Sequence, residues 1–220
     1  MTLASIQIGE TRTLGSDAAR NPFDQLWTTG IFKTPVVGPI ALGGLGLAGD
    51  HQADPTVHGG PDKAVCVYSA DHYEVWRASL GITPFEHGAF GENFTIAGLQ
   101  ENGTSIGDIW SVGDALVQVS QPRQPCWKLA RKWRVRDLTD QVVASGRTGW
   151  YFRVLRGGQV QSGDALALVE RPHPQWTIAA ANGVMHYREG GRAAAAALAA
   201  LPALSESWRE TLAHRVAAGG

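Results

Sequence analysis

Cys126 lies in a short segment whose residue types could make its thiol reactive. Residues 120–129 read Ser-Gln-Pro-Arg-Gln-Pro-Cys-Trp-Lys-Leu, with Arg123 three positions before the cysteine and Lys128 two after it. The two prolines fix φ and remove backbone donors, so the segment has few conformations open to it. A thiol beside cations loses its proton more readily, and the thiolate attacks carbon or binds a soft metal. The alternative is a buried cysteine packed in a proline-rich connection.

A second segment combines two glycines with basic side chains. Residues 57–63 read Val-His-Gly-Gly-Pro-Asp-Lys. Gly59 and Gly60 allow the backbone to approach a ligand closely, and successive N–H groups can form a concave nest for an anion. His58 and Lys63 would flank that nest with further donors. The alternative is an ordinary loop tip.

Three further segments place polar side chains beside glycines. Asn93, in the turn at 90–94, could hydrogen-bond the edge of a ring or satisfy its own turn. Arg147 offers a planar fork suited to phosphate, or it is a surface charge beside a turn. Thr29 and Lys33 flank another glycine with a hydroxyl and a cation. Together these segments suit a small anionic cofactor with a flat ring and a soft metal better than they suit a hydrolase.

Other candidates have simpler explanations. Trp127 and Trp150 could stack on a flat ring, or they could be core or wall residues. His51 and His58, with the acidic residues near them, could bind a hard metal or zinc, but their spacing matches no familiar ligand pattern. We expect Cys66 to pack as a small apolar side chain in a buried strand.

Composition indicates an ordinary globular protein. The 220 residues are 44% hydrophobic and 18% charged, with a net charge of -1. Lys and Arg are dispersed, so we expect no nucleic-acid binding. No apolar run reaches the ~20 residues that cross a bilayer, and the first residues do not have the pattern of a signal peptide. We therefore expect a cytoplasmic protein with no membrane association.

The segments that could bind a ligand or take part in catalysis lie between short apolar runs. These runs predict a β-rich domain over residues 1–170. Runs of this length, separated by glycine-bearing turns, favour a barrel or a sandwich. A helix should begin at Asp71, because Glu74 stands three residues later as in a capping box. The expected strands lie at 6–8, 31–33, 36–37, 64–68, 94–96, 109–112, 115–119, 150–155 and 165–169.

Residues 175–218 have a different pattern and predict a small domain of three helices. Ile178, Ala181 and Met185 recur at helical spacing, and residues 192–201 are rich in alanine. Ser205 can cap a third helix with apolar residues along one face. The expected fold class is mainly β (α+β), with a β-barrel core and a three-helix appendage.

Five of these segments, in order, resemble the MOSC-domain family, which is named for the C-terminal domain of molybdenum-cofactor sulfurase. They are 49–54, 57–64, 90–93, 120–129 and 146–150. The three-helix appendage narrows the resemblance to the YiiM-like branch of the family. The resemblance covers nearly the whole chain, and it implies a MOSC-type β-barrel core with a few helices.

The resemblance also implies a cofactor and an activity. Family members bind molybdenum cofactor, and Cys126 matches the cysteine that becomes a ligand of the metal. The branch reduces N-hydroxylated compounds such as 6-N-hydroxylaminopurine, which detoxifies mutagenic base analogues, with electrons from a flavin-containing reductase. We expect His58 to deliver protons. Contacts to the phosphate and pterin are expected from His58, Gly59, Gly60, Lys63, Asn93, Arg123 and Arg147, and also from Thr29 and Lys33.

The alternative is a non-catalytic carrier of molybdenum cofactor or sulfur, because a carrier needs the same thiolate and pocket. A cysteine hydrolase with Cys126 and His58 as nucleophile and base is a further alternative. The sequence predicts either a monomer or a homodimer.

Overall fold

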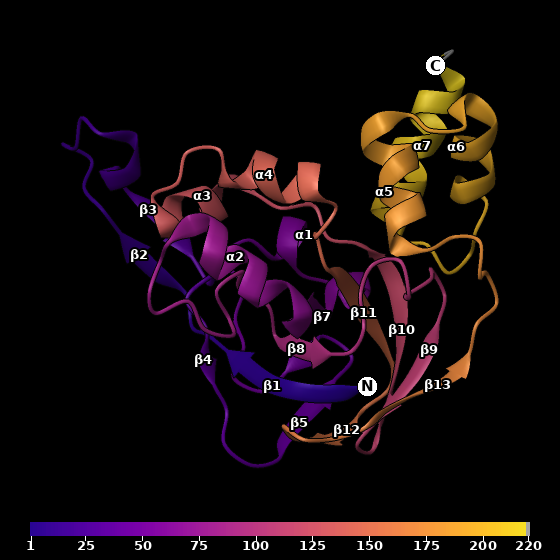
Figure 1. Ribbon diagram of the computed structural model, residues 1–220, viewed down its shortest axis with the longest axis horizontal. Helices are drawn as coiled ribbons and strands as arrows, with labels where there is room; N and C mark the ends of the chain where they lie inside the picture. Colours follow the sequence, from indigo (N-terminus) through magenta and orange to yellow (C-terminus); the bar gives the residue numbers. More distant parts are fainter. Residues whose placement is uncertain (219–220) are drawn as a thin grey trace.

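A curled sheet of eight strands forms the body of the protein (Figure 1), which we describe from a computed structural model covering residues 1–218. Neighbouring strands are antiparallel except β7 and β8, which are parallel. The sheet curls until the start of β1 meets the start of β13 through a bridge between Thr2 and Ala165. In sheet order the strands are β13 (Leu166–Glu170), β9 (Ile109–Val112), β10 (Ala115–Pro122), β11 (Trp150–Arg156), β7 (Val65–Ser69), β8 (Phe94–Ala97), β1 (Thr2–Ile8) and β4 (Thr34–Pro35).

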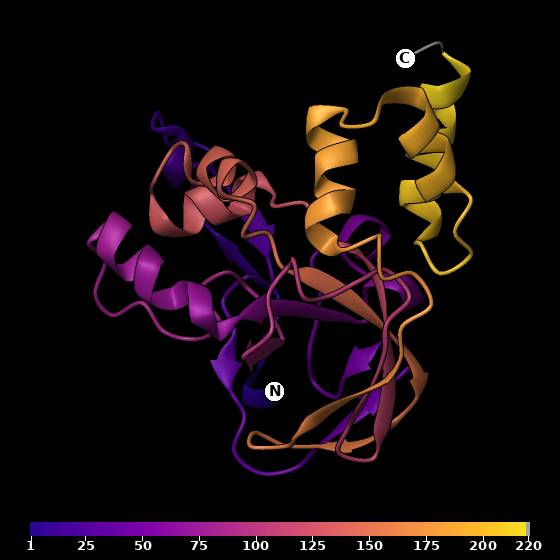
Figure 2. The ribbon, with the colours of Figure 1, turned by 45° about the vertical axis from the view of Figure 1, so that its right-hand side comes forward.

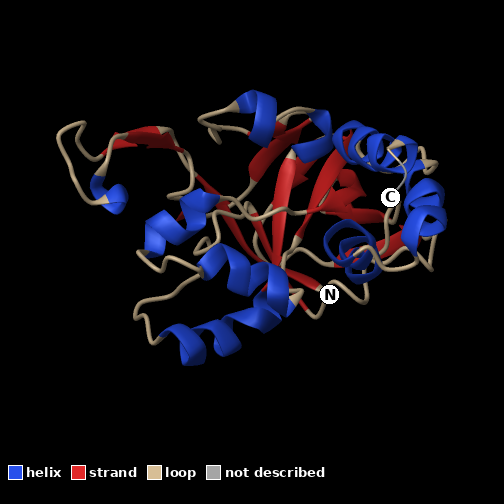
Figure 3. Cartoon of the chain, turned by 90° about the horizontal axis from the view of Figure 1, so that it is seen from above, coloured by secondary structure: helices blue, strands red, loops and turns tan. Residues whose placement is uncertain are grey.

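Two smaller sheets complete the β structure. One joins β12 (Gly158–Val160), β5 (Ile40–Gly43) and β6 (Gly46–Leu47). The other is the hairpin of β2 (Arg12–Leu14) and β3 (Trp27–Thr29), which projects from the body as an arm containing the short helix η1, Pro22–Asp24 (Figure 3). The arm returns to the body through β3, and this places Thr29 beside the sheet.

The sheet forms because its strands alternate apolar side chains that face one core. In β10, Ala115, Val117 and Val119 are buried while the residues between them are half-buried. Trp110 and Trp150 are fully buried in the same core, so Trp150 is a core residue and does not line a ligand site.

A second apolar cluster lies under three helices on the side of the arm. These are α2 (Tyr73–Leu80), α3 (Trp127–Trp133) and α4 (Leu138–Ser145). The turns α1 (Pro55–His58), η2 (Pro61–Lys63) and η3 (Ala70–His72) link strands and helices. The sequence patterns did not predict α3 or α4. Residues 127–133 hold five charged or tryptophan side chains, and this helix depends on the packing of Leu129 and Ala130.

Three local predictions are wrong. Residues 31–33 and 36–37 are not strands; the short strand β4 pairs with β1 between them. Asp71 does not cap α2, since its carboxylate accepts hydrogen bonds from the Gly98 backbone and the Gln100 side chain. In the case of Asp71, partners far away in sequence take up the carboxylate that local patterning had assigned to the helix start.

The C-terminal helices are α5 (Ile178–Tyr187), α6 (Gly191–Ala199) and α7 (Glu206–Ala217), which lie together in one group (Figure 2). Ser205 caps α7 as predicted. They share an apolar core with the sheet. Ser205 N–H donates to the carbonyl of Ser120 at 2.9 Å, and Asn182 Nδ2 donates to Thr148 Oγ1 at 2.9 Å. The predicted α+β class with a C-terminal three-helix appendage is confirmed, and the predicted β-barrel core takes the form of a half-barrel, the curled eight-stranded sheet. No helix in residues 1–218 is long and apolar enough to cross a membrane.

Candidate functional site

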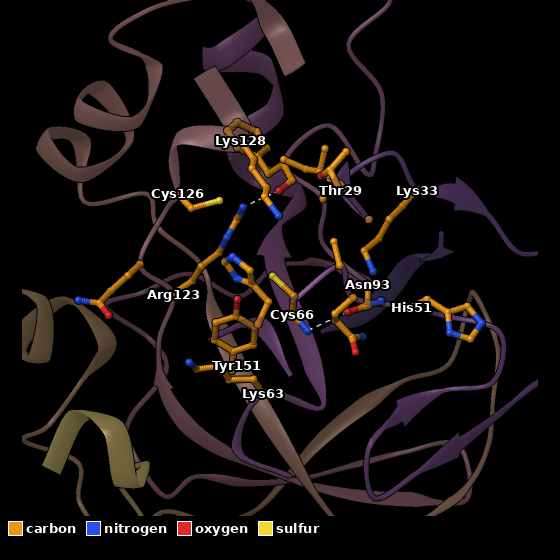
Figure 4. A pocket seen from close by; sticks show the side chains of 18 residues that line it. Thr29, Lys33, His51, Lys63, Cys66, Asn93, Arg123, Cys126, Lys128 and Tyr151 are labelled. Carbon is orange, nitrogen blue, oxygen red and sulfur yellow. Dashed lines mark hydrogen bonds between the residues drawn. The ribbon is translucent and has the colours of Figure 1, made fainter. Parts of the chain in front are cut away.

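Two adjoining cavities share lining residues between α1, the end of β10 and the start of α3. We call them the inner pocket, whose lining side chains Figure 4 shows, and the outer cavity. The inner pocket has a volume of about 90 Å³ and the outer cavity about 660 Å³. Cys126 and Lys128 line both parts, as do His58 and Lys63 from the other side. Of the ten residues predicted for the site, seven line the inner pocket: Thr29, Lys33, His58, Lys63, Asn93, Arg123 and Cys126.

Cys126 occupies the junction of the two cavities. Pro122 ends β10, and the Arg123 N–H donates to the carbonyl of Gly149 at 3.0 Å, which directs the chain away from the sheet. Cys126 stands at the N-cap of α3, and its carbonyl accepts from Leu129 N–H at 3.0 Å. Its thiol is free and partly accessible. The proline-rich connection therefore presents the thiol to the cavity instead of burying it.

Arg123 is a buried cation that the protein satisfies only in part. Its side chain is 6% exposed. Nη2 donates to the carbonyl of Phe90 at 2.5 Å, whereas Nη1 is buried without a hydrogen-bond partner. Within residues 1–218 no carboxylate forms an ion pair with it. A buried guanidinium with an unmet donor is costly alone, and an anion in this pocket would satisfy it.

His58 and Lys63 add basic groups to the lining of the cavity. Lys63 Nζ donates to the carbonyl of Val57 at 2.7 Å, which holds the ammonium against α1. Burial lowers the pKa of Lys63. Burial also lowers the pKa of His58, and the cations of Lys128, Arg123 and Lys63 lower it further. Both effects favour the neutral imidazole of His58 while no anion is bound.

The predicted glycine nest has a different role. Gly59 and Gly60 do not line the cavity. The Gly59 N–H donates to the carbonyl of Pro55 at 3.1 Å and so closes α1. A side chain at Gly59 would meet that carbonyl at 2.9 Å. These glycines allow the tight turn that brings His58 and Lys63 to the cavity, where both side chains are lining residues.

Two predicted cofactor contacts are already engaged within the protein. Lys33 Nζ lies 2.6 Å from Asp50 Oδ2 in a buried ion pair. Asn93 Nδ2 donates to the same carboxylate at 2.8 Å, and Asn93 Oδ1 accepts from Cys66 N–H at 3.1 Å. Lys33 and Asn93 thus fix the pocket wall. Thr29 is buried, and its hydroxyl oxygen accepts from Ile31 N–H at 3.1 Å.

Arg147 lies outside both cavities. Its backbone carbonyl accepts from the Tyr68 hydroxyl at 2.9 Å, and its N–H donates to Ser145 Oγ at 3.2 Å. The segment matters for folding through Gly149, whose N–H donates to Glu101 at 2.8 Å. Arg147 thus lines neither cavity, and its contact with a cofactor stays a prediction from the sequence.

Sequence reasoning missed several lining residues, above all Cys66 and Tyr151. They are paired across β7 and β11, so their side chains enter the pocket from the same face of the sheet. Burial raises the pKa of both the Cys66 thiol and the Tyr151 phenol. The expectation of a buried strand cysteine is confirmed, since Cys66 is 8% exposed. Its second role as pocket wall depends on the pairing of strands far apart in sequence.

Gln124 and His51 are also missed lining residues. Glycine at position 30 lets the backbone of His51 pack closely against it. A Cβ atom at Gly30 would lie only 2.3 Å from the His51 carbonyl oxygen. Within residues 1–218 no group of three His, Cys, Asp or Glu side chains is arranged to hold a metal ion. Cys126 is the more accessible of the two free thiols that line the inner pocket, since Cys66 is buried.

Comparisons with known proteins agree with the five sequence segments and the appendage. The MOSC-domain family matches residues 54–167, and the YiiM-like three-α-helix domain matches residues 176–219. The Bacillus subtilis protein YflK is 42% identical over 208 residues, covering 94% of this chain and 91% of YflK. The crystal structure of YiiM from Geobacillus stearothermophilus superposes with a TM-score of 0.81 at 40% identity, covering 98% of each chain.

A third relative carries a functional name. A Gibberella moniliformis protein named "Reductase" is 38% identical over 154 residues. The match covers 69% of this chain and 27% of that protein.

Proposed function

Because the chain belongs to the MOSC-domain family and ends in a YiiM-like three-helix domain, we propose that it is a molybdenum-cofactor-dependent reductase of N-hydroxylated compounds. The observation that carries this proposal is the free thiol of Cys126 at the mouth of a pocket whose buried Arg123 has an unmet donor. A relative named reductase supports an oxidoreductase.

The residues present fit the cofactor. Molybdopterin carries a phosphate, and Arg123 Nη1, Lys63 and Lys128 supply the positive groups that would bind it. The cofactor's dithiolene provides sulfur ligands, and the Cys126 thiolate would add another, as a soft transition metal prefers. The inner pocket of about 90 Å³ is too small for a whole pterin, so the cofactor would extend into the outer cavity.

The proposed reaction converts R–NHOH, two electrons and two protons into R–NH2 and water. When bound, the cofactor would supply the two-electron chemistry of N–O cleavage. The protein would orient the substrate, exclude competing nucleophiles and provide a proton. His58 is the residue we assign to proton delivery, because it lines both cavities beside Cys126. A bound phosphate would oppose the cations that lower its pKa, and so favour the protonated imidazole.

We assign electron supply to a separate flavin-containing reductase. Two thiols line the cavities, of which Cys126 is partly accessible and Cys66 is buried. The substrate and the cofactor would therefore share one site, and electrons would reach it from a partner protein.

The decisive experiment uses protein made in a host that synthesises molybdenum cofactor. Molybdenum would be measured by elemental analysis, and 6-N-hydroxylaminopurine reduction by chromatography of the adenine formed, with reduced methyl viologen as donor. We expect about one molybdenum atom per chain and turnover that Cys126→Ser abolishes. Bound molybdenum without turnover would instead indicate the carrier function, and protein that never acquires molybdenum would refute both.

A further inference from the structure

The outer cavity has an apolar wall that cofactor binding by the inner pocket does not explain. Trp127, Val57 and Leu26 line this cavity with 54%, 51% and 47% of their surface exposed. They come from α3, from α1 and from the residue before β3, three places far apart in sequence. Exposed apolar side chains that cluster around a cavity often indicate a ligand site, whereas single exposed apolar residues do not.

Trp127 is held in place although its indole is open. Its ring lies 5.7 Å from that of Trp27, centroid to centroid, and the guanidinium of Arg131 lies 5.6 Å from it. Arg131 is fixed in turn, because its Nε donates to the carbonyl of Phe23 at 3.1 Å. A rigid aromatic platform loses little entropy when a flat ligand stacks on it.

Gln124 adds a polar group to this wall. Its side chain lines both cavities and has no hydrogen-bond partner in the part of the chain that the structure describes. By contrast, the Gln121 amide donates to the Pro122 carbonyl and accepts from Ser207. A free carboxamide offers a donor and an acceptor side by side, which matches the edge of a nitrogen heterocycle.

We propose that the outer cavity is the recognition site for the substrate ring: Trp127 stacks on a flat heteroaromatic ring and Gln124 hydrogen-bonds its edge. This inference rests on the proposed function and names the substrate class that the outer cavity selects, namely N-hydroxylated compounds with a flat heteroaromatic ring. Trp127 directly follows Cys126, so a ring stacked on the indole lies next to the proposed metal ligand. An aliphatic N-hydroxylated compound gains nothing from the indole, and the enzyme therefore discriminates against it.

The cavity size agrees with this role. About 660 Å³ falls within the range of small-molecule sites and holds a purine with space for part of the cofactor. Stacking of a base on an aromatic side chain contributes roughly 1–3 kcal/mol. Removing the indole should therefore weaken ring binding about tenfold or more.

The test compares Trp127→Ala and Trp127→Phe with wild type, all loaded with cofactor. Two substrates are assayed, 6-N-hydroxylaminopurine and the aliphatic compound hydroxyurea. We expect Trp127→Ala to raise KM for the purine about tenfold, to change KM for hydroxyurea less than twofold, and to keep its molybdenum content. Trp127→Phe should recover most of the loss. Tyr187→Ala, which removes an aromatic 55% exposed on α5, is the control and should match wild type.

Calorimetric binding of adenine to the oxidised, loaded proteins without an electron donor separates this inference from the proposed function. If wild type reduces neither substrate, the function fails, but adenine binding about tenfold weaker in Trp127→Ala still supports the ring site. Unchanged adenine affinity in Trp127→Ala overturns the inference. Loss of molybdenum from Trp127→Ala also overturns the inference, because Trp127 would then contact the cofactor. An equal rise in KM for both substrates overturns it as well.

Discussion

Lys33 and Asp50 form a buried ion pair, with Nζ 2.6 Å from Oδ2 and side chains only 7% and 1% exposed. The same carboxylate accepts from the Gly9 N–H at 2.9 Å and from Asn93 at 2.8 Å. Asp50 thereby ties the start of the arm to β8 and to the pocket wall. The sequence predicts Lys33 as a phosphate contact. In the structure, Asp50 already neutralises its charge.

Breaking this pair should cost stability without directly removing a cofactor contact. Lys33→Met leaves Asp50 buried without its cation, a loss of about 3 kcal/mol in the free energy of unfolding. Urea denaturation of metal-free protein measures it. The double variant Lys33→Met/Asp50→Asn should regain part of the loss, and a Lys33→Met protein as stable as wild type would show that the pair is unimportant.

Arg123 and Arg147 form a matched pair for testing the anion site. Arg123→Met removes the buried unmet donor, so molybdenum content after purification should fall at least tenfold while the metal-free protein keeps its melting temperature within a few degrees. Arg147→Met should leave molybdenum unchanged, because Arg147 lies outside both cavities. Equal losses in the two variants would contradict the site described above.

The two thiols should respond differently to substitution. Cys126→Ser is expected to abolish reduction of the N-hydroxyl group and to leave the fold intact, because its thiol is partly accessible and makes no core contact. Cys66→Ala should lower the free energy of unfolding by about 1 kcal/mol and retain molybdenum. Thermal denaturation and elemental analysis of both variants check this. If only the Cys66→Ala variant loses molybdenum, then Cys66 is the metal ligand and the assignment of Cys126 is wrong.

Lys132 should make stability depend on pH in the alkaline range. Burial lowers its pKa to about 8, with Arg123 and Lys33 adding to the effect and Glu92 opposing it. The unfolded chain holds this proton up to a pKa of about 10.4, so between these values the unfolded state binds more protons. The free energy of unfolding of wild type should therefore rise relative to Lys132→Met from pH 8 to pH 10. Urea denaturation at pH 7, 8, 9 and 10 tests this, and parallel curves for the two proteins would refute it.

The local patterns that proved reliable are those whose partners lie nearby in sequence. Ser205 caps α7 because its hydroxyl needs only the N–H of Trp208, three residues on. The alternation in β10 and the apolar run of β7 likewise predict strands regardless of their neighbours. Asp71 failed as a cap because Gly98 and Gln100, brought near by the sheet, compete for its carboxylate.

For the site, the sequence by itself determined the chemical inventory: a thiol after two prolines, the basic side chains around it and the order of segments that marks the family. Tertiary structure alone decided which of them act together. It neutralised Lys33 with Asp50, left Arg123 Nη1 without a partner and placed Tyr151 opposite Cys66. The physical reason is that a buried charge or donor is defined by its neighbours in space, and in this fold those neighbours come from strands and loops tens of residues apart.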